Sequence, residues 1–222
     1  MSDLRLIVFD CDGTLVDSLF AIQHAMKLGF ESIGMDAPTP DAVRGIVGLS
    51  VPQAVAALAP GHPPETLAAL DRAFRASAIA HREAGPEADG QLYPGTIAAL
   101  ERLTTPETLM AVATGKARRG LEHTLDALAL RRFFIATQTA DDAPSKPHPG
   151  MLQNCERQTG VAPAQTVMIG DTTFDIEMAR AHDCKAVGVS WGYHPVDALR
   201  AAGAHVIIDD FDELDAALEA LR

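Results

Sequence analysis

Short apolar runs and helix-spaced apolar residues alternate over most of this chain. The runs are bounded by polar residues or glycine, which is typical of buried strands. We expect strands at 4–9, 108–113, 133–136, 166–169, 185–190 and 204–208. The segments between them predict helices that open at Pro94-Gly95-Thr96, carry Leu121, Leu125 and Leu128 in register, and span 148–160, 173–182, 196–202 and 211–221. This alternation predicts an α/β fold with right-handed crossovers and a parallel sheet covered by helices on both faces.

The stretch from residue 17 to 84 departs from this alternation, because its pattern is helical throughout. A helix start is expected at Asp17-Ser18, and further helices at 39–47, 50–59 and 63–84. The sequence therefore predicts two domains. The first is an α/β core of residues 1–16 and 86–222, and the second is a helical cap of residues 17–85 inserted after the first strand. We expect the hinge between them at Asp17-Ser18 and Gly85-Pro86.

Composition and charge exclude several classes of protein. Of the 222 residues, 47% are hydrophobic, which is enough to form a core. The net charge of −12 and the lack of a basic run argue against nucleic-acid binding, which needs clustered Lys and Arg. Three cysteines without a CxxC pair indicate a reducing compartment. Because neither a signal peptide nor an apolar stretch of about 18 residues is present, we expect a cytoplasmic protein with no membrane partner.

Unusual polar residues follow the predicted core strands, at the points where the strands end. Ligands of open α/β sheets bind at the carboxyl ends of the strands, so these groups are expected to share one rim of the sheet. The residues are Asp10 and Asp12 after the first strand, Thr114-Gly115-Lys116 after the second, Lys146 before the helix that follows the third, and Gly170-Asp171-Thr172-Thr173-Phe174-Asp175 after the fourth.

Together these side chains suit phosphoryl chemistry with a metal ion. Residues two apart in an extended segment face the same way, so Asp10 and Asp12 can reach one site, where Asp171 would complete an oxygen-rich cradle for Mg²⁺. Thr114 and the N–H groups after it can hold phosphate oxygens, and Lys146 supplies a positive charge for them. One carboxylate of the pair can attack phosphorus while its neighbour transfers protons, but the residues alone leave open which one attacks.

Each signal also has a purely structural explanation when it is taken alone. Asp171 and Asp175 could favour a helix N-terminus, and for Asp175 alone the two explanations are evenly balanced. Thr114-Gly115 could cap a helix, Lys146 could be a solvated surface residue, and Asp12-Gly13 is a common turn dipeptide. Four such signals, in order on successive strand ends, are much harder to explain as accidents.

These residues resemble the four motifs of the haloacid dehalogenase-like hydrolases. The matching segments are Asp10-Cys11-Asp12-Gly13-Thr14-Leu15, Thr114, Lys146-Pro147 and Gly170-Asp171-Thr172-Thr173-Phe174-Asp175. The tail from Trp191-Gly192-Tyr193 to Ile207-Ile208 is similar to the phosphoglycolate phosphatase-like branch. The resemblance covers essentially the whole chain. It implies a Rossmann-like sheet with a strand order similar to 3-2-1-4-5 and membership of the subfamily whose cap follows the first strand.

Carried over to this sequence, the resemblance implies that Asp10 is a nucleophile that forms an aspartyl-phosphate. Asp12 would be the general acid for the leaving group and then the general base for the hydrolytic water. The implied cofactor is Mg²⁺, bound by the Asp10 side chain, the Asp12 backbone carbonyl and Asp171. Thr114 and Lys146 would hold the phosphoryl group, and Asp175 would support the site from behind these residues.

The second motif departs from the family pattern, because it reads Thr-Gly-Lys where Thr-Asn is commoner. Gly115 still offers its N–H group to the phosphate, and Lys116 can add a cation. Within the family, true dehalogenases lack an aspartate at the position of Asp12, and phosphonate-cleaving relatives have a small residue there. Both chemistries are therefore disfavoured.

The cap is expected to close over the site, exclude water and select the leaving group. We predict that Arg44 and Ser50 contact the substrate, since Gly48-Leu49-Ser50 matches a substrate-facing turn of related caps and an arginine suits a second anionic group. A solvated position on a helix surface is an equally good explanation of Arg44.

The leading hypothesis is a Mg²⁺-dependent phosphatase of small phosphomonoesters, with 2-phosphoglycolate as the first substrate to test. The alternatives are a phosphomutase or pyrophosphatase of the same superfamily, and a non-hydrolytic phosphate-binding protein like the receiver domains of signalling proteins. Receiver domains need only one small domain, and the intact Asp12 favours turnover. We expect a small phosphorylated metabolite as partner, and a monomer or homodimer.

Overall fold

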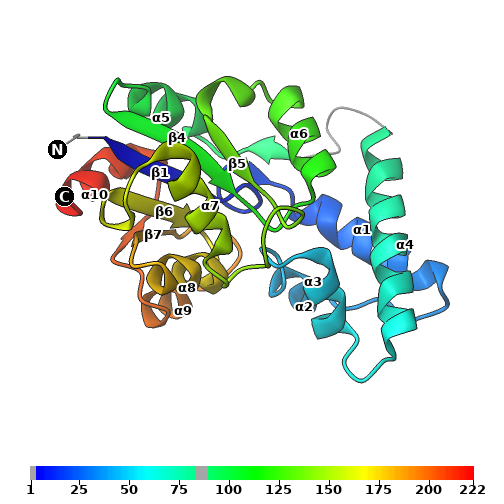
Figure 1. The fold of residues 1–222 in the computed structure, drawn as a ribbon. Coiled ribbons are helices and arrows are strands. Elements are labelled where there is room, and N and C mark those ends of the chain that lie inside the picture. The colour runs from blue at the N-terminus through cyan, green and yellow to red at the C-terminus, as the bar shows by residue number, and fades with distance from the viewer. Residues whose placement is uncertain (1–3, 84–89) are drawn as a thin grey trace.

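The structure is a computed structural model that describes residues 4–83 and 90–222. Figure 1 shows a central sheet with helices on both sides and a group of helices, the cap, beside it. The sheet has six parallel strands in the order β5-β4-β1-β6-β7-β8. The strands are β1 (Arg5–Phe9), β4 (Thr108–Ala113), β5 (Ala136–Gln138), β6 (Thr166–Gly170), β7 (Lys185–Val189) and β8 (Val206–Ile208). Numbered along the chain, this order confirms the expected 3-2-1-4-5 and adds a sixth strand at the edge.

Helices cover both faces of this sheet, which explains why the strands are apolar on both sides. In β1, Ile7 and Phe9 pack with α5, α6 and α10 on one face, while Leu6 and Val8 pack with α7, α8 and α9 on the other. These helices are α5 (Thr96–Leu103), α6 (Arg118–Ala127), α7 (Gly150–Thr159), α8 (Thr173–Ala181), α9 (Val196–Ala201) and α10 (Leu214–Ala220). A short 3-10 helix, Phe211–Glu213, precedes α10. The predicted α/β class is confirmed.

The strand expected at 133–136 lies a few residues later than its apolar run. Arg131–Phe133 form a 3-10 helix, and the strand β5 begins at Ala136, where it pairs with Ala111 of β4. Phe133 and Phe134 pack against the hydrophobic core from the connecting turn. The apolar run therefore marks core packing rather than strand pairing, and the prediction of its bounds was wrong.

The cap contains α1 (Leu19–Ser32), α2 (Pro40–Arg44), α3 (Val51–Leu58) and α4 (Pro64–Glu83). It has a hydrophobic core of its own, in which Met26 and Phe30 of α1 pack with Leu70 of α4. The backbones of α1 and α4 approach closely, because a Cβ atom at Gly29 would lie 3.0 Å from the backbone nitrogen of Phe74. The predicted helical insertion is confirmed.

A two-stranded antiparallel sheet joins the cap to the core, which the helical pattern did not reveal. It pairs β2 (Val16–Asp17) with β3 (Gln91–Leu92). Strands of two residues are too short to show a period, so only the fold brings them together. The expected hinge residue Asp17 lies in this sheet, whereas Gly85-Pro86 lies outside the described residues. The two domain boundaries stay a prediction. Among the described helices, none is long and apolar enough to cross a membrane.

Candidate active site

The residues predicted to share one rim of the sheet come from its three central strands and the loop before α7. β1 pairs with β4 on one side and with β6 on the other, so the ends of these strands meet. Asp10 follows β1, Thr114 follows β4 and Asp171 follows β6, and all three side chains are buried. Lys146, in the loop before α7, is fully buried at the same place. The structure therefore brings the four strand-end signals together.

Asp10 presents one carboxylate oxygen that has no partner. Its Oδ1 accepts a hydrogen bond from the Cys11 N–H at 2.7 Å and lies 2.9 Å from the Lys146 ammonium nitrogen. Its Oδ2 is buried and has no hydrogen-bond partner among the described residues. Burial raises the pKa of Asp10 to about 7, although Lys146 acts in the opposite direction. Because an unpaired buried oxygen is costly, this atom is placed for a ligand or for chemistry.

Lys146 is held between two carboxylates without any contact with solvent. Its ammonium nitrogen lies 2.9 Å from Asp10 Oδ1 and 2.5 Å from Asp175 Oδ1. Burial disfavours the ammonium charge, but Asp10 and Asp175 outweigh it and raise the pKa of Lys146 above its ordinary value. The side chain is therefore a fixed cation, so the explanation of Lys146 as a solvated surface residue is wrong.

Asp175 fixes both Lys146 and the start of α8. Its Oδ2 accepts hydrogen bonds from the N–H group of Thr172 at 3.1 Å and from Thr172 Oγ1 at 2.7 Å. The bond from the N–H group is the one by which Asp175 takes part in a capping box. Its Oδ1 holds Lys146. Both explanations considered for Asp175 therefore apply, since the residue caps the helix and orients the buried cation through the same carboxylate.

Asp171 is held rigidly against Asp10. Its Oδ1 accepts a hydrogen bond from Thr14 Oγ1 and its Oδ2 from the Tyr193 N–H, both at 2.9 Å. Two glycines leave room for it, because a Cβ atom at Gly13 would lie 2.2 Å from Asp171 Oδ2 and one at Gly192 would lie 2.1 Å from its Cβ. Burial raises the pKa of Asp171 well above its ordinary value, with Asp175 and Asp10 adding to the effect.

The side chains of Asp10, Asp171 and Asp175 form an oxygen cluster. Each offers a carboxylate oxygen, and these atoms all lie within 4.8 Å of one another. Carboxylate oxygens are the donors that Mg²⁺ prefers, and a divalent cation would relieve the repulsion between them. Both oxygens of Asp175 hold Lys146 and Thr172. Both oxygens of Asp171 also accept hydrogen bonds, whereas Asp10 keeps one oxygen without a partner among the described residues. Metal binding by Asp10, Asp12 and Asp171 stays a prediction.

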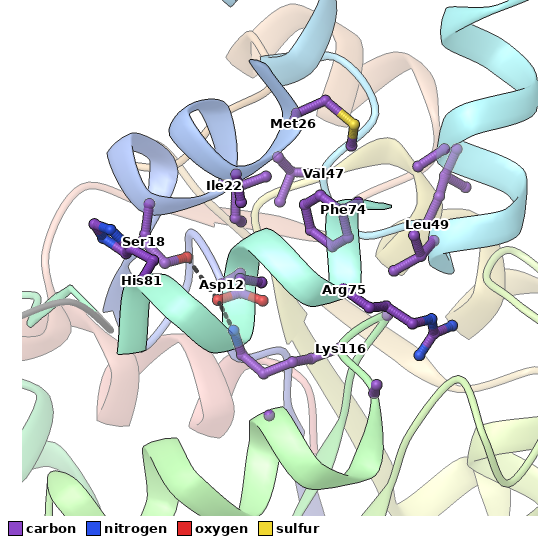
Figure 2. A pocket seen from close by; sticks show the side chains of 18 of the residues that line it. Asp12, Ser18, Ile22, Met26, Val47, Leu49, Phe74, Arg75, His81 and Lys116 are labelled. Atoms are coloured by element: carbon purple, nitrogen blue, oxygen red, sulfur yellow. Dashed lines mark hydrogen bonds and ion pairs between the residues drawn. The ribbon is translucent and has the colours of Figure 1, made fainter. Parts of the chain in front are cut away.

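Asp12 turns its side chain away from this cluster and toward the cap. Its Oδ1 accepts a hydrogen bond from Ser18 Oγ at 2.6 Å and lies 2.9 Å from the Lys116 ammonium nitrogen, as the dashed lines of Figure 2 show. The side chain thus lies between the start of α1 and the loop after β4. Each of the two neighbouring aspartates therefore contacts a lysine, Asp10 within the buried cluster and Asp12 on the side of the cap.

Comparison with known proteins identifies the family of this chain. A family model described as haloacid dehalogenase-like hydrolase matches residues 7–189. The chain belongs to this family. The resemblance inferred from the four motifs is thereby confirmed, as is the prediction of an enzyme.

Individual relatives of this hydrolase match over nearly the whole chain. A protein named "Probable phosphatase IndB" of Dickeya dadantii is 35% identical over 97% of this chain and 94% of its own. A phosphoglycolate phosphatase of Photobacterium profundum is 28% identical over 95% of this chain and 94% of its own. Among solved structures, a haloacid dehalogenase-like family hydrolase from Streptococcus pneumoniae is 25% identical and superposes with a TM-score of 0.84 over 98% of this chain and 99% of its own.

The cap of this hydrolase is closed onto the core at the turn Gly48-Leu49-Ser50. The backbone N–H of Ser50 donates to Ser145 Oγ at 2.8 Å, next to Lys146. A Cβ atom at Gly115 would lie 2.4 Å from the Gly48 carbonyl oxygen and 2.5 Å from that of Leu49, so glycine is required where the commoner motif has an amide side chain. The departure in the second motif thus lets the cap approach the rim of the sheet.

The remaining predicted substrate residues differ in their burial and in the contacts that they make. Thr114, Gly115 and Lys116 are in place, with Thr114 Oγ1 accepting from the Lys116 N–H at 3.2 Å. Ser50 is buried beneath the closed turn. Arg44 is exposed at the end of α2 and does not line the cavity beside Asp12. Substrate binding stays a prediction for all six of these residues, namely Thr114, Gly115, Lys116, Lys146, Arg44 and Ser50.

Several residues that shape the site were missed as parts of it, namely Ser18, Thr14, Ser145 and Tyr193. Ser18 was identified only as a helix start and hinge, yet it also holds Asp12. Thr14 stood in the first motif without a role, and it holds Asp171. Ser145 and Tyr193 act through backbone or long-range contacts, so no local sequence signal marks them.

We predict that Asp175→Asn lowers kcat by roughly 10- to 100-fold, because the Lys146 ammonium loses one of its two anionic partners and its fixed position. Asp175→Glu keeps the charge and the capping box and should recover part of the loss. Glu177→Gln, exposed on the same helix, is the matched control. The measurement is kcat from steady-state kinetics, divided by the folded fraction of each variant. The melting temperature of each variant is measured as well. A loss of kcat that vanishes after correction for the folded fraction would show a structural role only.

Proposed function

We propose that this hydrolase is a Mg²⁺-dependent phosphatase of small phosphomonoesters that works through an aspartyl-phosphate on Asp10. The observation that carries the proposal is the unpartnered Oδ2 of Asp10, a buried oxygen of a carboxylate that contacts the Lys146 ammonium through Oδ1 and clusters with Asp171. A nucleophile needs such a free atom, and the charge formed on the phosphoryl oxygens needs such a cation.

The donor set fits Mg²⁺. Asp10 and Asp171 would supply carboxylate oxygens, and the family resemblance adds the backbone carbonyl of Asp12. When bound, the ion would offset the negative charge of the carboxylates and of the substrate phosphate, and would keep water among its ligands. The cost of burying Asp10 and Asp171 side by side supports this assignment, since both have raised pKa values through burial when no cation is present.

In the first half of the proposed reaction, Asp10 Oδ2 attacks phosphorus and the bond from phosphorus to the leaving oxygen breaks. Lys146 stabilises the negative charge on the phosphoryl oxygens, and the backbone after Thr114 orients them. Asp12 gives a proton to the leaving oxygen, for which its position on the side of the cap is suitable.

In the second half, Asp12 takes a proton from a water molecule that attacks the phosphorus of the aspartyl-phosphate. The bond between phosphorus and Asp10 Oδ2 breaks, inorganic phosphate leaves and the carboxylate is restored. Ser18 and Lys116 hold Asp12 in place during both proton transfers. The closed turn at Gly48-Leu49-Ser50 limits access of other water to the intermediate.

The names of the relatives support a phosphomonoester as substrate and make 2-phosphoglycolate the reference compound for the first assay. The three cysteines, all free and buried, support the cytoplasm as the compartment.

The direct test is phosphate release from a panel of phosphomonoesters and pyrophosphate, with Mg²⁺ or with EDTA. We expect turnover only with the metal, and a fall of at least about 10⁴-fold for Asp10→Asn, which removes the nucleophile. Glu177→Gln serves again as the control for an exposed carboxylate. Turnover that persists in Asp10→Asn, or in EDTA, would contradict the mechanism. Phosphoryl return to a bound sugar without release of phosphate would favour the mutase.

We further predict that Mg²⁺ raises the melting temperature more at about pH 8 than at about pH 5. The pKa of Asp10 is raised to about 7 in the metal-free fold, whereas an unfolded aspartate has a pKa of about 3.9. Between these values only the folded state keeps the proton, so the metal-free protein loses stability as the pH rises through this window. Ionised carboxylates bind Mg²⁺, which restores that stability.

Thermal melts with MgCl₂ or EDTA across this pH range measure the effect. The rise in melting temperature caused by Mg²⁺ should be smaller in Asp10→Asn, because this variant lacks the titrating carboxylate. Equal increments at both pH values in the unaltered protein would show that no buried carboxylate is linked to metal binding in this range.

A further inference from the structure

A cavity of about 280 Å³ lies between the cap and the core, next to Asp12. Helices α1, α3 and α4 and the turn before α3 line it from the cap. The core contributes Gly115, Lys116, Ala117, Arg119 and Gly120. Of the catalytic site, only Asp12, Ser18, Gly115 and Lys116 contribute to its wall. Asp10 and Lys146 do not, so the cavity adjoins the buried carboxylate cluster at Asp12 and does not contain it.

The wall of this cavity is mainly apolar. Figure 2 shows Ile22 and Met26 of α1, Val47 of the turn and Phe74 of α4 gathered on the cap side of Asp12. Leu49 and Ile79 extend the same surface. Apolar walls with a few polar groups at one end are typical of sites that bind an apolar body and fix one polar atom of it. Here the polar end is the pair of Asp12 and Lys116.

The charged side chains in the wall are already engaged or exposed to solvent. Lys116 lies 2.9 Å from Asp12, and Arg75 lies 2.8 Å from Asp71. Arg119 is exposed, and His81 and Arg82 are half-buried. Among the described residues, no basic side chain of this wall is fully buried, as a cation dedicated to a carboxylate on the leaving group would be.

We propose that the substrate is a phosphomonoester whose leaving group has an apolar body larger than glycolate. The inference rests on the proposed phosphatase function and specifies its substrate class. The cavity has room for several water molecules. A two-carbon acid would leave most of its apolar wall wet, whereas each methylene group buried there strengthens binding.

A series of n-alkyl phosphates from methyl to hexyl tests this, with 2-phosphoglycolate as the acidic comparator. With Mg²⁺ present, kcat/KM should rise about four-fold per methylene until the cavity is filled. It should be higher for hexyl phosphate than for 2-phosphoglycolate. The affinities of non-hydrolysable n-alkylphosphonates for the Mg²⁺-loaded protein should follow the same slope, which tests the cavity separately from turnover.

Two leucine variants of α4 test whether the dependence of kcat/KM on alkyl chain length arises in this cavity. Ala78 lines the cavity, so Ala78→Leu should fill part of it and reduce the hexyl-to-methyl ratio at least about ten-fold. Ala76 is exposed on the same helix, and Ala76→Leu should leave the ratio unchanged. Both variants keep alanine-like helix propensity, so both are expected to fold.

The outcomes separate this inference from the proposed function. A flat or falling alkyl series, or a preference for 2-phosphoglycolate, would overturn the inference while Mg²⁺-dependent turnover that Asp10→Asn abolishes still supported the phosphatase. Failure of every ester to turn over would contradict the phosphatase. In that case, phosphonate affinities that do not change with chain length would also overturn the apolar pocket. Affinities that rise with chain length would support it.

Discussion

The ammonium group of Lys146 lies without solvent contact between the carboxylates of Asp10 and Asp175, and the rest of the site is arranged around it. Removing one partner of a buried ion pair costs about 3–5 kcal/mol, because the other charge is left uncompensated. Asp175 is tied in turn to Thr172 at the start of α8. A single buried cation thus joins Asp10 to the start of α8, and one oxygen of Asp10 has no partner among the described residues.

The sheet order makes this arrangement possible. β1 lies between β4 and β6, so the loops that leave these three strands meet at one rim. The crowding there requires glycine at Gly13 and Gly192 against Asp171, and at Gly115 against the closing turn of the cap. In the proposed reaction, the core would place the groups that act on phosphorus and the cap would place apolar groups beside Asp12. Attack and leaving-group selection would then be carried out by separate parts of the chain.

Much of the core could be predicted from the sequence, because buried strands and the polar residues that end them are local signals. Asp10, Thr114, Lys146 and Asp171 each stand at a strand end or a helix start, and the general rule for open sheets brings them together. Contacts between distant segments could not be predicted in this way. The hydrogen bond of the Tyr193 N–H to Asp171 joins residues far apart in sequence, and the β2–β3 pairing depends on strands of two residues. The apolar wall of the cavity beside Asp12 could not be predicted from the sequence either. The spacing of Ile22, Met26 and Phe74 indicates only that they pack between helices. Only the fold shows that these side chains also line the cavity.

The central claim is that Asp10 Oδ2 forms a covalent bond with phosphorus. The most direct measurement is a crystal structure of the Mg²⁺-loaded protein with beryllium fluoride, which mimics a phosphoryl group on a carboxylate. We predict that beryllium is bonded to Asp10 Oδ2, with its fluorides near Lys146 and the N–H groups after Thr114. Asp10 and Asp171 would hold the Mg²⁺ ion. Beryllium fluoride bonded to any other side chain, or held in the site with Asp10 Oδ2 unbonded, would contradict it.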